Sequence, residues 1–375
     1  MTASLAAKLR QFDPDLPLER ARTIPAAWYS DPEVYAAERR AVFGGTWQAA
    51  GRLDQVAGPG CFFTADIAGE PVLVARDGEG VLRAFFNVCR HRAAQVMNEP
   101  AGRATRFRCR YHGWTYDLAG RLRGTPEFDG VADFRREEQG LVELDVDVWG
   151  PLVWVRPRAG GPGLAEYLTP LPEMAAELGL EALRFMGRRE YQLGCNWKVF
   201  VDNYLDGGYH VNTVHPGLSG VLDYANYRTQ VAGNTSLQSS PLRPADPGAD
   251  SPTGKLRTGK AAYYWWVFPN LMLNAYQGMM DTNWVLPLGP DRCRVVFDFY
   301  FDRTGTPETD QYIAESIAVT HQIQLEDMGI CEEVQKGLAS RSYDTGRFSV
   351  RREAAGYHFH RLLARRLLAD LATHS

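Results

Sequence analysis

The sequence predicts an α+β chain, in which a small all-β domain precedes a larger domain of mixed strands and helices. From about Thr46 to Val155, short β-rich runs alternate with turn signals, such as the Asp-Gly pair in PVLVARDGEGVLRAFFNV. A Gly/Pro-rich stretch at 157–163 reads as a linker, and helix-like stretches and aromatic β-rich runs follow it. With 375 residues, the chain is long enough for two sizeable cores.

We therefore divide the chain into an N-terminal helical segment at 1–43, an all-β domain at 44–156 and a larger domain at 164–375. In the first segment, Ser30 and Asp31 are candidate helix caps and Pro32 fits the first turn. In the larger domain we expect long helices at 308–338 and near 353–371. The Gly/Pro/Ser/Asp-rich stretch at 232–260 predicts a long loop.

Composition excludes several classes of function. The formal net charge is −4, which gives no indication of nucleic acid or an anionic membrane as a partner. No segment approaches the roughly 18 consecutive apolar residues of a membrane span, and the N-terminus does not read as a secretory signal. The six cysteines lack the spacing of a disulfide framework, so we expect reduced thiols or metal ligands in a cytoplasmic protein.

Two cysteine–histidine pairs form the most specific motif. Cys89-Arg-His91 is followed, after 17 residues, by Cys109-Arg-Tyr-His112, and each pair ends a β-like run. Two thiolates and two imidazoles are the ligand set of a Rieske [2Fe–2S] cluster. The alternative is a structural zinc site, but zinc fingers favour two to four residues between paired ligands, and only one residue separates the first pair here.

The stretches CRHR and CRYHGWTYD resemble the N-terminal domain of the Rieske non-haem iron oxygenases. Both ligand pairs and the YHGW flank agree with that family. The motif is also compatible with a Rieske electron-transfer protein without oxygenase activity, so the second half of the chain has to distinguish the two.

A second metal site is indicated in NWKVFVDNYLDGGYHVNTVHP, which contains His210 and His215. An offset of five residues turns a helix by roughly 140°, so the two histidines share a metal only if the helix is broken. Gly207-Gly208 and Pro216 supply such breaks. The stretch resembles the segment that binds mononuclear Fe(II) in the same oxygenases.

Non-haem Fe(II) oxygenases need two histidines and one carboxylate, and QLEDMGICEEVQKGL offers Glu326 and Asp327. Asp327 falls on a helical stripe that is otherwise apolar, whereas Glu326 lies on a polar face. A carboxylate on a buried stripe needs a cation or a hydrogen-bond donor. Asp327 is therefore the predicted third ligand, in agreement with the family pattern. The other four residues of this stripe are apolar, namely Ile323, Ile330, Val334 and Leu338.

The resemblance implies a bridging role for Asp206. In the family, an acidic residue just before the first iron histidine contacts a cluster histidine of the neighbouring subunit. Three residues separate Asp206 from His210, where the usual pattern has two, so Gly208 is an apparent insertion. The alternative role for Asp206 is a simple helix cap.

Within the family, the stretches NWKVFVDNYLDGGYHV, FPNLMLNAYQGMMDTNWVLPLGPDRCRVVFDF and EDMGICEEVQKGL resemble the quaternary-ammonium oxygenases, whose choline monooxygenase branch shares the Gly-Gly insertion. This resemblance implies a helix-grip catalytic domain, a homotrimer, and electrons supplied by a separate flavin/iron–sulfur NAD(P)H reductase. It also implies mono-oxygenation of a small quaternary ammonium substrate with O₂, either choline to betaine aldehyde hydrate or demethylation or cleavage of betaine- or carnitine-like compounds. The chain lacks a G-x-G-x-x-G fingerprint after a strand, consistent with an outside reductase.

Aromatic faces hold quaternary ammonium groups, and the densest aromatic run is 263–268. Tyr263 and Trp265 point to one side of a strand there, and Tyr264 and Trp266 to the other. We expect one pair to line a pocket and the other to pack beneath it. The predicted pocket residues are Tyr263, Trp265, Asn274, Met279 and Trp284. The same aromatic composition suits a flat aromatic substrate, so the large subunit of a ring-hydroxylating dioxygenase is the alternative.

Overall fold

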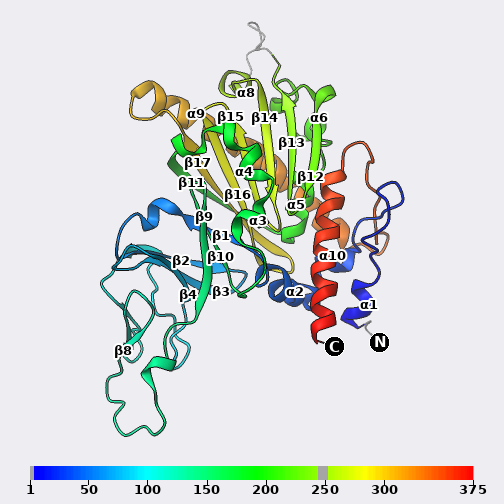
Figure 1. Cartoon of the computed structure of the whole chain (residues 1–375). Helices are drawn as coiled ribbons and strands as arrows, with labels where there is room; N and C mark the ends of the chain where they lie inside the picture. Colours follow the sequence, from blue (N-terminus) through cyan, green and yellow to red (C-terminus); the bar gives the residue numbers. More distant parts are fainter. Residues whose placement is uncertain (1–3, 244–251, 375) are drawn as a thin grey trace. The chain divides into compact units, whose positions relative to one another are not determined.

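The computed structural model describes residues 4–243 and 252–374, which form two compact units (Figure 1). The small unit is Phe43–Glu166, and the large unit combines Met1–Val42 with Tyr167–Ser375. The first 42 residues therefore belong to the large unit. The predicted fold class, a strand-rich domain followed by a domain of one sheet and long helices, is confirmed.

The small unit is built from two antiparallel sheets. Its seven-stranded sheet has the order β1-β10-β9-β4-β3-β2-β5, and a three-stranded sheet has the order β6-β7-β8. The strands of the larger sheet are β1 Gln48–Arg52, β2 Cys61–Ile67, β3 Glu70–Arg76, β4 Leu82–Phe86, β5 Ala101–Arg103, β9 Glu143–Trp149 and β10 Leu152–Arg156. Those of the smaller sheet are β6 Phe107–Arg108, β7 Thr115–Tyr116 and β8 Leu122–Gly124.

The core of the small unit includes the two cysteines of the predicted cluster. Phe107 contacts Phe62 and Phe85 edge to face, with ring centroids 6.4 and 6.5 Å apart. Cys89 and Cys109 belong to the same buried cluster of side chains. The packing of the core therefore holds both cysteines in place.

The large unit contains a seven-stranded antiparallel sheet with the order β11-β17-β16-β15-β14-β13-β12. Its strands are β11 Arg184–Leu193, β12 Arg228–Ala232, β13 Thr235–Pro241, β14 Ala261–Val267, β15 Leu271–Tyr276, β16 Met279–Gly289 and β17 Arg292–Phe301. The prediction of a loop at 232–260 is wrong in part, because this stretch contains β13 and the short helix α8 Pro252–Leu256. β13 forms from a polar sequence because it pairs with a strand on each side. Residues 244–251 lie outside the described part of the chain.

Two long helices and one shorter helix matter most for the site. They are α5 Trp197–Tyr204, α9 Pro307–Leu338 and α10 Ala354–His374, and α5 contacts both α9 and strands β16 and β17. α9 begins at a cap in which Thr306 accepts a hydrogen bond from the amide of Thr309. The shorter helices are α1 Leu5–Leu9, α2 Pro32–Glu38, α3 Leu164–Leu168, α4 Leu171–Met174, α6 Val211–Val214 and α7 Pro216–Ser219.

Of the two candidate caps, Asp31 and not Ser30 caps α2, since the Asp31 side chain accepts a hydrogen bond from the amide of Glu33. Within the described residues, no helix combines the length and the apolar character that crossing a membrane requires.

Candidate functional site

Two loops of matching backbone geometry carry the four predicted cluster ligands. In each loop, the cysteine carbonyl accepts a hydrogen bond from the amide four residues later, which is Ala93 for Cys89 and Gly113 for Cys109, both at 3.0 Å. The closing residue has a left-handed backbone in both loops, with φ of 59° at Ala93 and 72° at Gly113. The repeated turn places each cysteine and its histidine at the tip of a tight loop.

The four side chains at these tips fit a cluster. Cys89 and Cys109 are each 2% exposed, and the rings of His91 and His112 lie 4.6 Å apart between centroids. Nδ1 of His91 is buried and has no hydrogen-bond partner among the described residues. A buried polar nitrogen without a partner is costly, and a metal ligand role removes that cost. The donor set of two thiols and two imidazoles matches a Rieske cluster.

Sequence reasoning missed Tyr116, which contacts one of the cluster cysteines. Its hydroxyl lies 3.4 Å from Sγ of Cys89 and accepts a hydrogen bond from the amide of Arg90 at 3.0 Å. Because Arg90 occupies a lone pair of this oxygen, the hydroxyl hydrogen is available to the sulfur. Burial raises the pKa of Tyr116, so the phenol stays protonated. Its place four residues after His112 gave no signal of this contact.

Two glycines turn the chain between α5 and the predicted iron histidines. Gly207 and Gly208 both have φ of 70°. A Cβ atom at Gly207 would lie 2.1 Å from the carbonyl oxygen of Arg352, and one at Gly208 would lie 2.9 Å from the ring of Tyr227. Only glycine fits both the conformation and the space. The helix is therefore broken where the sequence predicts a break, and the one-turn helix α6 follows.

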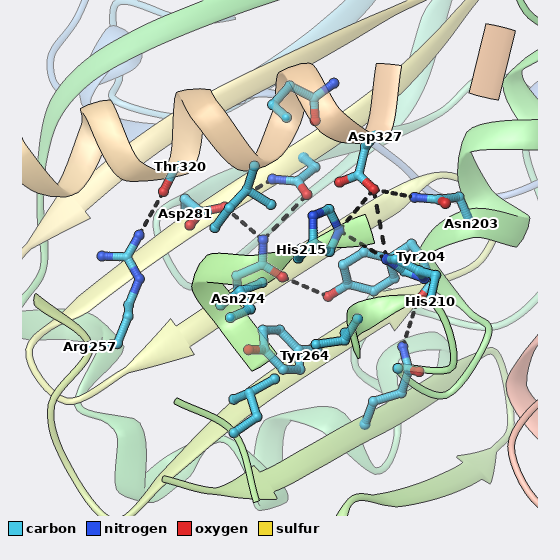
Figure 2. A pocket seen from close by; sticks show the side chains of 18 of the residues that line it. Asn203, Tyr204, His210, His215, Arg257, Tyr264, Asn274, Asp281, Thr320 and Asp327 are labelled. Atoms are coloured by element: carbon cyan, nitrogen blue, oxygen red, sulfur yellow. Dashed lines mark hydrogen bonds and ion pairs between the residues drawn. The ribbon is translucent and has the colours of Figure 1, made fainter. Parts of the chain in front are cut away.

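His210, His215 and Asp327 converge on one point (Figure 2). Nε2 of His215 lies 3.0 Å from Nε2 of His210 and 3.1 Å from Oδ1 of Asp327, and Nε2 of His210 lies 3.7 Å from the same Oδ1. In the described part of the chain, this is the one group of at least three His, Cys, Asp or Glu side chains whose ligand atoms all lie within 4.8 Å. Two imidazoles and one carboxylate facing the same point fit a non-haem Fe(II) site with open positions.

Three neighbouring groups orient these side chains. Nδ1 of His210 lies 2.6 Å from Oδ2 of Asp206, and Nδ1 of His215 lies 2.8 Å from Oε2 of Glu326. Each carboxylate accepts the Nδ1 hydrogen, so the Nε2 lone pair of each ring faces the shared point. Asn203 donates from Nδ2 to Oδ1 of Asp327 at 2.7 Å. These contacts fix the direction of all three ligand atoms.

The face of α9 that lines the site is more polar than the sequence predicts. Asp327 lies with the histidines, but Val334 of the predicted apolar stripe is 44% exposed, so that part of the prediction is wrong. The buried positions of α9 include Ser316, Thr320 and Gln324. Polar residues occupy this face because it borders a cavity, and apolarity alone was therefore a poor guide to it.

Asp206 caps the turn and orients a ring at the same time. Its carboxylate accepts hydrogen bonds from the amides of Tyr209 and His210, each at 3.0 Å, in addition to the ring of His210. The extra residue Gly208 therefore leaves Asp206 in contact with His210. The predicted bridge from Asp206 to a neighbouring subunit stays a prediction.

A cavity of the large unit borders the triad, and one wall is a row of side chains across four neighbouring strands. Gln238, Tyr264, Asn274 and Asp281 are cross-strand partners on β13 to β16, and all four line the cavity. Paired residues of adjacent strands point to the same face of a sheet. The register of the sheet thus assembles this wall.

Of the predicted pocket residues, the structure brings Asn274 to the cavity and leaves the other four away from it. Trp265, Met279 and Trp284 are between 1 and 5% exposed within the unit, and neither they nor Tyr263 line the cavity. Along β14 it is Tyr264 that faces the cavity. The pair chosen from the sequence, Tyr263 and Trp265, is therefore the wrong one of the two. Alternation along a strand separates two faces but does not tell which one a cavity borders.

Four tyrosines surround much of the cavity, namely Tyr204, Tyr227, Tyr264 and Tyr276. Tyr264 stacks on Tyr227 at 6.4 Å between centroids and meets Tyr276 edge to face at 6.1 Å. The hydroxyl of Tyr204 donates to Oδ1 of Asn274 at 2.9 Å. Burial raises the pKa values of all four phenols, so they present neutral rings to the cavity.

Both halves of the chain match known families. Residues 46–135 match the Rieske [2Fe-2S] domain, and residues 180–369 match the catalytic domain of the ring hydroxylating alpha subunit. The chain belongs to the family of Rieske oxygenase alpha subunits. A catalytic domain in addition to the cluster domain distinguishes this oxygenase from a simple electron carrier, and the prediction of an enzyme is confirmed.

Three relatives illustrate the resemblance. Choline monooxygenase, chloroplastic, of Arabidopsis thaliana is 41% identical, covering 94% of this chain and 85% of its own length. The carnitine monooxygenase oxygenase subunit of Escherichia coli (strain K12) is 29% identical, covering 92% and 94%. The crystal structure of a quaternary ammonium Rieske monooxygenase with L-carnitine superposes with a TM-score of 0.79 at 26% identity, covering 98% and 99%.

Membership in this family implies a Rieske cluster and a mononuclear iron, and the residues described above fit both groups. When bound, the two groups supply electron transfer and O₂ activation, with electrons from a separate reductase. The chain's own contribution is orientation. Asp206 and Glu326 accept hydrogen bonds from Nδ1 of the two histidines, and Asn203 donates a hydrogen bond to one carboxylate oxygen of Asp327.

Proposed function

We propose that this Rieske oxygenase mono-oxygenates a quaternary ammonium substrate. The cavity beside His210, His215 and Asp327 has walls of neutral tyrosine rings. A quaternary nitrogen can neither lose its charge nor donate a hydrogen bond, so aromatic faces are its natural partners. The named substrates of the relatives, choline and carnitine, share this group.

The observation that carries the proposal is the carboxylate of Asp281 in the cavity wall. Asp281 is 2% exposed, and its Oδ1 accepts hydrogen bonds from Asn274 at 2.8 Å and Asn283 at 2.9 Å. A buried carboxylate is costly without a positive partner, and a cationic substrate supplies one. The alternative, a ring-hydroxylating dioxygenase subunit, is disfavoured because a flat apolar arene would leave this charge uncompensated.

The ligand roles follow from the same geometry. In this proposal Cys89, His91, Cys109 and His112 hold the cluster, and the triad of His210, His215 and Asp327 holds Fe(II). Asp206 links the iron site of one subunit with the cluster of the next in a homotrimer. The separate reductase is of the flavin/iron–sulfur type that uses NAD(P)H.

We also place the protein in the cytoplasm. All six cysteines are free, and five of them are buried. Two of the buried cysteines, Cys89 and Cys109, are assigned to the cluster. The other three would be at risk of oxidation or wrong pairing during folding in an oxidising compartment. The plant relatives carry the description chloroplastic, which names a different compartment. Fractionation of the native host, followed by detection of the chain, tests this placement.

The direct assay combines the purified protein with a generic reductase, NAD(P)H and O₂. Consumption of a panel of quaternary ammonium compounds is compared with consumption of naphthalene- and benzene-type arenes. We expect turnover of at least one ammonium compound and none of the arenes. Turnover of arenes alone would reject the substrate class while keeping the oxygenase.

A further inference from the structure

The cavity of the large unit contains two opposite charges that do not pair with each other. Arg257 and Asp281 both line it and are 4% and 2% exposed. Among the described residues, no carboxylate oxygen lies within the 4.0 Å ion-pair distance of Arg257, and no basic nitrogen lies that close to Asp281. A buried charge that has no opposite charge in direct contact destabilises the folded state.

Neutral groups hold Arg257 in place. Its Nη2 donates to Oγ1 of Thr320 at 2.7 Å, and its Nη1 lies 3.3 Å from Sδ of Met279. The guanidinium carbon lies 5.1 Å from the ring centroid of Tyr276. These contacts fix the direction of the guanidinium but give it no carboxylate in direct contact, and a guanidinium so placed favours one.

Gln324 adds a buried donor that lacks an acceptor. Gln324 lies one helical turn after Thr320 on the same face of α9, lines the cavity and is 1% exposed. Its Nε2 has no hydrogen-bond partner among the described residues. The cavity thus contains one amide N–H without an acceptor and one guanidinium without a carboxylate, and an anionic oxygen suits both.

Arg257 lies on the side of the cavity away from the iron ligands, and Asp281 lies between the two (Figure 2). Figure 2 shows Arg257 and Thr320 on one side and His210 and Asp327 on the other, with Asn274 between them. The reacting carbon of a substrate has to lie near the iron ligands. The far end of the same molecule then extends toward Arg257.

We propose that the substrate is a zwitterion, a quaternary ammonium compound with a carboxylate that Arg257 binds at the end of the cavity opposite the iron ligands. The inference rests on the proposed function and narrows it. The tyrosine rings and Asp281 face the cationic nitrogen, and Arg257 with Gln324 faces the carboxylate. A purely cationic substrate such as choline would leave Arg257 without a carboxylate in direct contact and add a second positive charge to the cavity.

The test measures kcat/KM of the complete oxygenase with its reductase for choline, glycine betaine and γ-butyrobetaine. For the wild type, we expect the better betaine to exceed choline by about 100-fold, as a charge-assisted bidentate pair would provide. Arg257→Gln should lower the ratio of betaine to choline by a similar factor, mainly through KM, and Arg257→Lys should lower it less. Lys260→Gln, which removes an exposed charge three residues away, should not change the ratio.

Choline as the best wild-type substrate, or an unchanged ratio in Arg257→Gln, would overturn the proposal while the proposed function stands. Turnover of neither choline nor either betaine would overturn both. If Arg257→Gln fails to fold, Thr320→Val replaces it, because loss of this hydroxyl frees the guanidinium and should lower the ratio by about 10-fold. The wild-type ratio alone decides the question if neither variant folds.

Discussion

Nδ1 of His215 lies 2.8 Å from Oε2 of Glu326, the residue directly before the predicted iron ligand Asp327. Adjacent residues of α9 thus serve one metal site in two ways, since Asp327 faces the shared point and Glu326 holds the ring that faces it. His215 is 2% exposed, so water offers little replacement for this contact.

Replacing Glu326 should therefore weaken iron binding without unfolding the protein. Loss of a carboxylate that orients a histidine ligand typically lowers metal affinity about 10- to 100-fold. We expect this loss for Glu326→Ala, measured by iron content after dialysis against a chelator. Glu333→Ala, at an exposed position of the same helix, is the control and should retain its iron. Equal iron retention in the two variants would contradict the orienting role.

Asp206→Asn should leave both metal groups bound and slow the arrival of electrons at the iron. The asparagine retains an oxygen for the ring of His210, which now lies 2.6 Å from Oδ2 of Asp206, but it loses the negative charge. Stopped-flow oxidation of the reduced cluster, together with iron content, measures the two effects separately. Asp223→Asn removes a carboxylate that bonds Asn226 in another turn and should behave as wild type. Normal turnover of Asp206→Asn would refute the bridge between subunits.

Tyr116→Phe should lower the reduction potential of the cluster. The hydroxyl at 3.4 Å from Sγ of Cys89 favours the more negative, reduced state. One hydrogen bond of about 1 kcal/mol corresponds to roughly 40 mV for a single electron. A redox titration followed by electron paramagnetic resonance measures this shift. In Tyr111→Phe, which alters an exposed ring stacked on His112, the potential should stay at the wild-type value.

Asp281→Asn should stabilise the fold at high pH. Burial raises the pKa of Asp281 to about 6, above the usual 3.8, so the folded state binds this proton more tightly than the unfolded state. The contribution of Asp281 to the free energy of unfolding of the wild type therefore falls as pH rises from 4 to 6, and it remains lower above that range. Asn should gain up to about 3 kcal/mol at pH 8 and about half of that at pH 5, measured by urea unfolding. The same variant should bind quaternary ammonium compounds more weakly.

Asp298→Asn provides a control of the opposite sign in the same sheet. Asp298 is fully buried and makes two hydrogen bonds, of 2.6 and 2.7 Å, to the guanidinium of Arg188. Removing its charge should cost about 1–3 kcal/mol at pH 8. If both variants lose stability to the same extent, Asp281 is not an uncompensated charge.

The sequence was most informative where spacing alone restricts the chemistry. Two cysteine–histidine pairs and a helix broken at Gly207-Gly208 leave few arrangements, and His210 and His215 indeed face one point. The pocket was predicted poorly, because the choice between Tyr263 and Tyr264 depends on which sheet face borders the cavity. That face is set by the register of four strands and the position of α9, which are long-range properties.

Contacts between distant residues were equally invisible. Tyr116 reaches Cys89, and Glu326 reaches His215, across 27 and 111 residues of sequence. Neither contact has a local pattern, since a tyrosine on a short strand and a glutamate on a polar helix face are ordinary. Arg257 follows a short helix in a stretch that reads as a loop, so its burial in the cavity had no signal either.

The central claim is that this oxygenase attacks a quaternary ammonium compound at the site of His210, His215 and Asp327. A single-turnover experiment tests it without a reductase: the protein is reduced chemically, freed of reductant and exposed to O₂ with glycine betaine, γ-butyrobetaine or choline. We predict oxygenated or demethylated product, up to about one per mononuclear iron, and none from His215→Ala. Failure of all three compounds with iron-replete wild-type protein, or equal product from His215→Ala, would contradict the account.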